Sequence, residues 1–143
     1  MSELFSKEAI LLYKTVWENL QEGKTLSGDL AMIAEAMKEH PEFSPFWGMG
    51  EAAFQPHEID GYVVNPLVHI GLHVTIEKQI LIDDPMEVAV AIKNLLAKAM
   101  PRHEAVHQVA GIWGNLYFRS VRRGDPFEEW VYVHELMALA GNG

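Results

Sequence analysis

Apolar residues recur three to four positions apart through most of the chain, with polar residues between them, and this pattern is typical of amphipathic α-helices. Helices are predicted over roughly 6–22, 28–39, 66–81, 86–99, 102–123 and 126–140. Gly23, Pro101 and Gly124 each stand just past the end of a predicted helix, where glycine and proline commonly end one. The pattern therefore predicts an all-α fold, a helical bundle of about five to six helices.

Three of the predicted helix starts carry the same signal, a capping residue followed by proline at the first helical position. These dipeptides are Asn65-Pro66, Asp84-Pro85 and Asp125-Pro126. Glu87 and Glu128 follow the last two caps by three residues, as in a capping box. We therefore expect helices to begin at these three places.

Residues 40–65 form the one long stretch without helical periodicity, and they are rich in proline, glycine and aromatic residues. Within it, Tyr62-Val63-Val64 is β-like but too short to form a sheet alone. A loop of this length either acts as a functional lid or covers one end of the core. Its aromatic residues favour the second interpretation, in which they cover the core. Because no repeat or linker divides the chain, a single helical domain over 1–143 is expected.

Two pairs of histidines share one spacing, His69 with His73 and His103 with His107. Side chains four apart on a helix share a face, with Cβ atoms roughly 5 to 6 Å apart, so both imidazoles of a pair can converge on one ion. Both pairs also follow apolar stripes and should face inward, where imidazoles need a metal or hydrogen-bond partners. The prediction is that all four hold one divalent transition metal such as zinc, iron or nickel. The alternative is hydrogen-bonded core histidines that bind nothing, the role expected for the remaining residues His40, His57 and His134.

Two glutamates lie close to these pairs in the sequence. Glu77 follows His73 by one helical turn, so it is predicted either to join His73 on the ion or to support it from behind. Glu104 lies inside the string His-Glu-Ala-Val-His, which resembles the motif of zinc peptidases. Under that alternative alone Glu104 is catalytic, activating a zinc-bound water, and Glu128 supplies the third ligand. The alternative leaves His69 and His73 idle and offers no strand along which a peptide substrate would align.

Composition narrows the function classes further. Hydrophobic residues make up 49% of the 143 positions and charged residues 22%, which is typical of a folded, soluble domain rather than a disordered one. The net charge of -9 argues against a nucleic-acid groove, and the absence of cysteine removes disulfides, thiolate ligands and cysteine nucleophiles. The most apolar stretch, 63–76, contains Asn65 and Pro66 and is a poor membrane span. A cytoplasmic location is expected.

The stretch from Asn65 to His73, with the residues that follow it to Pro85, resembles the signature of an uncharacterised bacterial family catalogued as domain of unknown function 1841. The resemblance covers roughly residues 4–124 and is specific over 65–85 and 102–107, where the second histidine pair opens a helix. It implies importance for the paired histidines but no activity. The family often has acidic residues where this chain has Gly111 and Asn115, and glutamate where it has Lys78, so a site here would be poorer in carboxylate.

Whether the protein is an enzyme stays open at this point, and no substrate is identified. Besides metal binding and peptidase activity, a non-enzymatic interaction or assembly domain is possible, including a homo-oligomer, with histidines in its core. An apolar patch for such assembly would come from aromatic residues near the C-terminus, namely Trp113, Phe127, Trp130 and Tyr132. A core position is the more common role for residues of these types.

Overall fold

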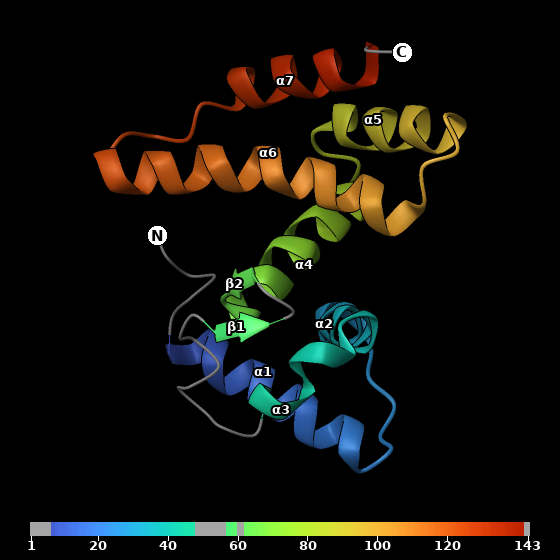
Figure 1. Ribbon diagram of the computed structural model, residues 1–143, viewed down its shortest axis with the longest axis vertical. Coiled ribbons are helices and arrows are strands. Elements are labelled where there is room, and N and C mark those ends of the chain that lie inside the picture. The colour runs from blue at the N-terminus through green and yellow to red at the C-terminus, as the bar shows by residue number, and fades with distance from the viewer. Residues whose placement is uncertain (1–6, 48–56, 60–61, 142–143) are drawn as a thin grey trace. The chain divides into compact units, whose positions relative to one another are not determined.

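The computed structural model describes residues 7–47, 57–59 and 62–141 (Figure 1). The described helices are α1 (Lys7–Gln21), α2 (Gly28–Glu39), the 3-10 helix η2 (Pro41–Phe43), α3 (Ser44–Trp47), α4 (Pro66–Ile82), α5 (Met86–Ala97), α6 (Arg102–Arg123) and α7 (Glu129–Gly141). The predicted all-α fold is confirmed, with seven α-helices in the described part of the chain rather than five or six. The additional helix is the single turn α3, which lies inside the stretch expected to be irregular.

A short antiparallel hairpin joins β1 (His57–Ile59) to β2 (Tyr62–Val64). In its register His57 is opposite Val64, and Ile59 is opposite Tyr62. The β-like run at Tyr62 is thus a strand, and because three residues cannot form a sheet alone, it pairs with its neighbour in the sequence.

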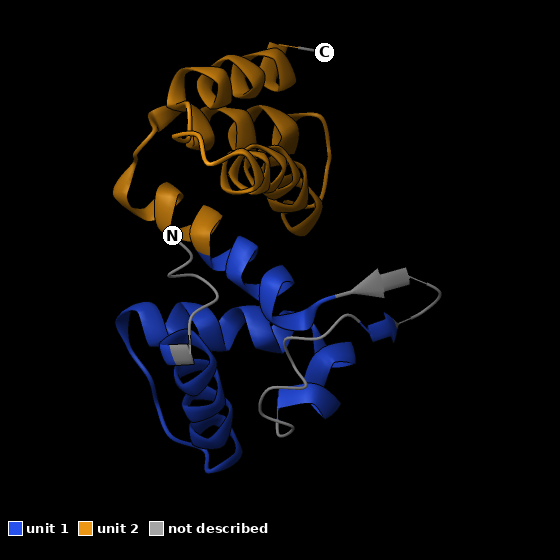
Figure 2. Cartoon of the chain, turned by 90° about the vertical axis from the view of Figure 1, so that its left-hand side faces the viewer, with its two compact units in different colours: residues 1–74 blue, residues 75–143 orange. Residues whose placement is uncertain are grey.

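The chain divides into two compact units, residues 1–74 and 75–143, and the division falls within α4 (Figure 2). That the whole chain folds as one domain stays a prediction. Among the described helices, none combines the length and the apolar character needed to cross a membrane.

The core of unit 1 is formed by α1, α2, the short helices η2 and α3, and the first half of α4. Its buried side chains come from all of these elements: Tyr13, Val16, Ile33, Ala34, Ala36, Met37, Phe43, Trp47, Leu67 and Ile70. Phe43 and Trp47 are each 2% exposed, so the aromatic residues of the described segment 40–47 cover the core, as their composition favoured.

Unit 2 contains the second half of α4 followed by α5, α6 and α7, and the last three helices pack against one another. Its core is aliphatic apart from Tyr132, and its buried residues include Val88, Ala91, Ile92, Val106, Val109, Tyr132 and Leu136. These positions recur at helical spacing on each helix, as expected for amphipathic helices that share a core.

Of the predicted helix starts, the one at Asn65 is confirmed in detail. Its Oδ1 accepts a hydrogen bond from the Val68 backbone N–H at 3.3 Å, and its carbonyl accepts one from His69 at 3.0 Å. The second predicted helix begins at Met86, as its predicted range requires, but its N-cap is Pro85 and not Asp84. The Asp84 N–H is already used by the Gln79 carbonyl at the end of α4.

The third start is displaced, since α7 begins at Glu129 and not at residue 126. Gly124 adopts a left-handed conformation with φ of 70°, and the Asp125 N–H donates to the Ser120 carbonyl at 3.0 Å, so this residue closes α6 instead of capping α7. The carbonyl of Glu128 accepts the first bond of α7, from Val131 at 3.1 Å.

Candidate metal centre

Three imidazole rings pack together in unit 1. The ring centroid of His40 lies 4.7 Å from that of His69 and 4.5 Å from that of His73, and the His69 and His73 centroids are 5.0 Å apart. His40 is 3% and His73 2% exposed, while His69 is partly buried. From the sequence, His40 was expected to be a structural histidine unrelated to the two pairs. The structure instead places it in this cluster.

Local structure fixes both the position and the tautomer of His40. The residue ends α2 as its C-cap, and its ring Nδ1 lies 2.8 Å from the carbonyl oxygen of Ala36. Because a carbonyl only accepts hydrogen bonds, Nδ1 carries the proton, and the lone pair of the neutral ring is on Nε2. Phe43 stacks on the ring with centroids 5.3 Å apart and planes 4° from parallel. A backbone carbonyl behind the ring is the usual support of a metal-binding histidine.

The Nε2 atom of His40 faces the Nε2 atom of His69 at 3.1 Å. In the absence of an ion, His69 serves as the donor of this bond, since the lone pair is on the His40 side. A separation of 3.1 Å is that of a hydrogen bond, so His69 is the hydrogen-bond partner of His40 across this contact.

Unit 2 carries the second pair. His103 and His107 lie in the first two turns of α6, both partly buried, and their ring centroids are 4.4 Å apart. The rings are adjacent because residues four apart share a helix face, as the spacing predicts. That this pair and the unit 1 histidines share one ion stays a prediction.

The carboxylate of Glu77 has a partner of its own. Its Oε2 accepts a hydrogen bond from Nη1 of Arg102 at 2.6 Å, and its Oε1 accepts one from Nη2 at 2.9 Å. Both oxygens are thus engaged in a bidentate ion pair within unit 2, at 28% exposure for Glu77 and 50% for Arg102. Ligation of a metal by Glu77 stays a prediction, and it would require this pair to open.

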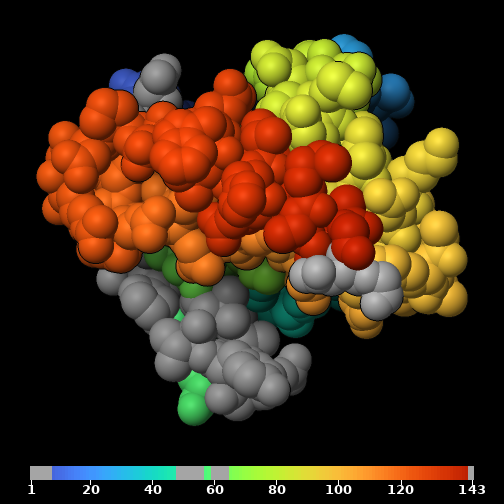
Figure 3. Space-filling view, turned by 90° about the horizontal axis from the view of Figure 1, so that it is seen from above, coloured from blue at the N-terminus to red at the C-terminus, as the bar shows by residue number. Residues whose placement is uncertain are grey.

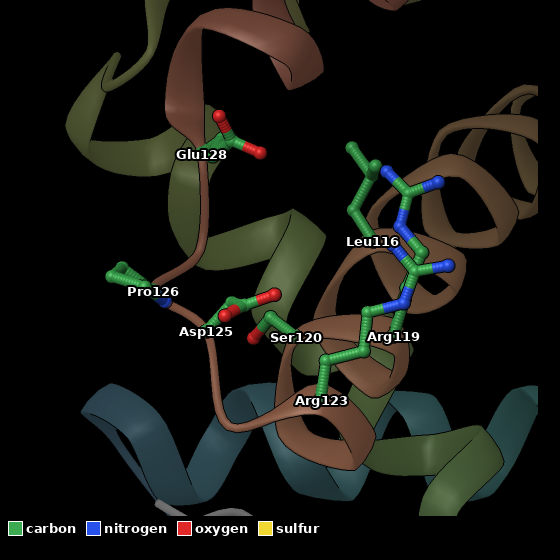
Figure 4. A pocket seen from close by; sticks show the side chains of 7 residues that line it. All are labelled: Leu116, Arg119, Ser120, Arg123, Asp125, Pro126 and Glu128. Atoms are coloured by element: carbon green, nitrogen blue, oxygen red, sulfur yellow. The ribbon is translucent and has the colours of Figure 1, made fainter.

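The residues of the peptidase alternative do not lie together. Glu104 is exposed in the first turn of α6, where a negative charge is favoured by the helix dipole. Glu128 lies at the opposite end of α6, in a hollow shared with Arg119 and Arg123, and the figure shows its carboxylate facing the two guanidinium groups (Figure 4). Twelve residues of helix, roughly 18 Å, separate His107 from Arg119. The prediction of Glu128 as third zinc ligand is therefore wrong.

The predicted aromatic patch is mostly internal. Tyr132 is 1% exposed, and its hydroxyl donates to Oε1 of Gln79 at 2.7 Å. Trp113 and Phe127 are partly buried, with centroids 5.8 Å apart, whereas Trp130 is 70% exposed on α7, whose outer surface is seen in Figure 3. One exposed ring is not a contiguous apolar patch. Assembly through this surface stays a prediction.

Among the comparisons with known proteins, only the family comparison gives a match. No curated protein and no solved structure matches the chain significantly. The sequence profile of the family described as Domain of unknown function (DUF1841) matches residues 6–138, which include all the histidines of both units named above. The chain therefore belongs to the DUF1841 family.

Proposed function

We propose that this protein binds one divalent transition-metal ion through histidines of both units. The ligands would be His40 and His73, whose rings pack together in unit 1, and His103 and His107, whose rings are adjacent in unit 2. Imidazole nitrogen suits zinc, iron or nickel, and a set without thiolate or carboxylate does not select among them. Compared with the ligands expected from the sequence, His40 takes the place of His69 as a ligand, and Glu77 is left outside the set.

The orientation of His40 carries the proposal. Its Nδ1–H is fixed on the Ala36 carbonyl, so its Nε2 lone pair is directed into the group of buried rings and away from the backbone. A buried polar atom needs a partner, and a lone pair surrounded by imidazoles suits either an N–H donor or a metal ion. His69 is that donor in the metal-free protein. On binding, the ion would take the place of the His69 N–H at the Nε2 lone pair of His40.

Four imidazoles would fill the tetrahedral coordination of zinc and leave no open position for water or substrate. We therefore propose a structural or metal-holding role for the ion, not hydrolysis. The position of Glu128 at the far end of α6 supports this choice over the peptidase alternative, because the peptidase would lack its third ligand.

The test uses protein purified without a polyhistidine tag and titrated with Zn²⁺ by isothermal calorimetry, together with metal analysis. One equivalent is expected for the wild-type chain. His40→Ala and His73→Ala should each weaken binding at least tenfold, as loss of one ligand or its support does. His134→Ala is the matched control, because His134 is exposed on α7 and outside the cluster.

Three results would overturn the proposal in different ways. Equal zinc binding by wild type and a His40→Ala/His73→Ala variant would remove unit 1 from the site. Unchanged affinity and stoichiometry after His103→Ala/His107→Ala would show that the second pair does not share the ion. A stoichiometry of two equivalents would show that each group binds an ion of its own.

A further inference from the structure

Helix α6 begins without help from a capping side chain. Its N-cap is Pro101, which makes no side-chain cap hydrogen bond, and its first intrahelical bond runs from the Ala105 N–H to the Pro101 carbonyl at 3.0 Å. The first N–H groups of a helix lack intrahelical partners, so an uncapped first turn tends to fray. His103 lies in this turn, and its ring stays next to His107 only while the turn is helical.

The ion pair between Glu77 and Arg102 acts on the same turn. Arg102 is the first residue of α6, and both of its terminal nitrogens bind the carboxylate of Glu77 on α4, at 2.6 and 2.9 Å. Two parallel N–H···O bonds fix the direction of the guanidinium as well as its position. The start of α6 is thereby attached to the body of another helix of unit 2.

We propose that Glu77 and Arg102 are positioning residues of the metal centre: their ion pair keeps the first turn of α6 folded and presents His103 and His107 as a preformed chelate. This inference rests on the proposed function. It assigns Glu77 a role different from the one expected from the sequence, because its charge is used on Arg102 and not on the ion. A ligand pair that is already ordered loses less conformational entropy on binding than one that frays.

The experiment compares Arg102→Gln, Glu77→Gln and the charge reversal Glu77→Arg/Arg102→Glu in the full chain. Co²⁺ is the probe, because its visible absorption reports the ligand set as well as the affinity. Each single variant is expected to weaken Co²⁺ binding about tenfold, the lower end for loss of a supporting partner, with an unchanged absorption spectrum at saturation. The charge reversal should recover most of the loss. Lys24→Gln is the matched control, because Lys24 forms an exposed ion pair with Glu22 at 2.9 Å outside α4 and α6.

Amide hydrogen exchange in the metal-free protein gives a second readout. The Ala105 N–H should exchange faster in Arg102→Gln than in wild type, whereas amides in the middle of α6 should not change. An exposed ion pair contributes little to global stability, so these variants are expected to remain folded.

The results that would overturn the inference are distinct from those that concern the ion itself. If Glu77 is a ligand, Arg102→Gln will leave the affinity unchanged or raise it, and Glu77→Gln alone will alter the spectrum. Wild-type affinity in both single variants, or unchanged exchange at Ala105, would refute the positioning role while leaving the metal centre in place. No Co²⁺ binding by the wild-type chain would refute the metal centre, and the positioning role would fall with it.

Discussion

The hydrogen bond between Tyr132 and Gln79 gives a quantitative test of how unit 2 is held together. The two residues are 53 positions apart, on α7 and α4, and the tyrosine hydroxyl donates to the amide oxygen at 2.7 Å. Tyr132 is 1% exposed, so its ring is part of the core as well. Tyr132→Phe removes the hydroxyl donor and keeps the ring.

The expected loss follows from the burial of the two partners. A net hydrogen bond contributes about 0.5–1.5 kcal/mol, and a buried acceptor left without a partner adds to this cost. The Gln79 side chain is only partly buried, so water can reach its oxygen and reduce the added cost. We therefore expect Tyr132→Phe to lower the free energy of unfolding by about 1–2 kcal/mol, or the melting temperature by roughly 2–8 °C for a chain of this size.

Urea unfolding followed by circular dichroism measures this change, with Gln79→Met and the double variant completing the cycle. The double variant should lose about 1 kcal/mol less than the sum of the single losses, because the second substitution finds the bond already broken. If the two units unfold in separate transitions, the loss should fall on that of unit 2. A change below about 0.3 kcal/mol for Tyr132→Phe, or strict additivity, would show that the bond contributes nothing measurable.

Three further outcomes are expected. Asn65→Ala should lower the free energy of unfolding by about 1 kcal/mol through loss of the cap on Val68, and Asn65→Asp should not; equal losses in the same urea assay would contradict this. Burial raises the pKa of Tyr13, and burial with the charge of Glu129 raises the pKa of Tyr132. The contribution of these two tyrosines to stability should therefore be constant below a pH of about 10 and fall above it, because tyrosines ionise first in the unfolded chain. Ultraviolet titration in which all four tyrosines ionise normally in the folded protein would refute it. Zinc at one hundred times its dissociation constant should raise the free energy of unfolding by about 2.7 kcal/mol in wild type, measured by thermal denaturation; the same gain in His73→Ala would count against ligation by that residue.

The elements that could be predicted are those whose signals are local. Asn65 caps α4 because its own side chain reaches the backbone three residues ahead, and that geometry can be inferred from the sequence. The adjacency of His103 and His107 follows in the same way from the period of the helix. Asp125 carries a similar signal but misled the assignment, because Gly124 turned its N–H back to the preceding helix.

The parts of the candidate site that the sequence did not predict, the positions of His40 and Glu77, depend on contacts between distant segments. His40 meets His69 across 29 positions, where the end of α2 and Phe43 of η2 contact α4, and no periodic pattern encodes such a contact. One signal was present: His40 is followed by Pro41, which marks a helix end, and helix ends place side chains beside free carbonyls. The engagement of Glu77 by Arg102 was equally hidden, because ion pairs between helices depend on tertiary packing.

The flat contact of Phe43 on His40 bears on how fast the proposed centre would load. An imidazole that is stacked on one side and hydrogen-bonded at Nδ1 has little freedom to swing, so the empty and occupied proteins would share one ring orientation. Capture at this ligand would then wait on the ion shedding its hydration shell and not on the side chain finding its rotamer. Release would be slow for the same reason, which suits a retained ion better than one passed quickly to another carrier.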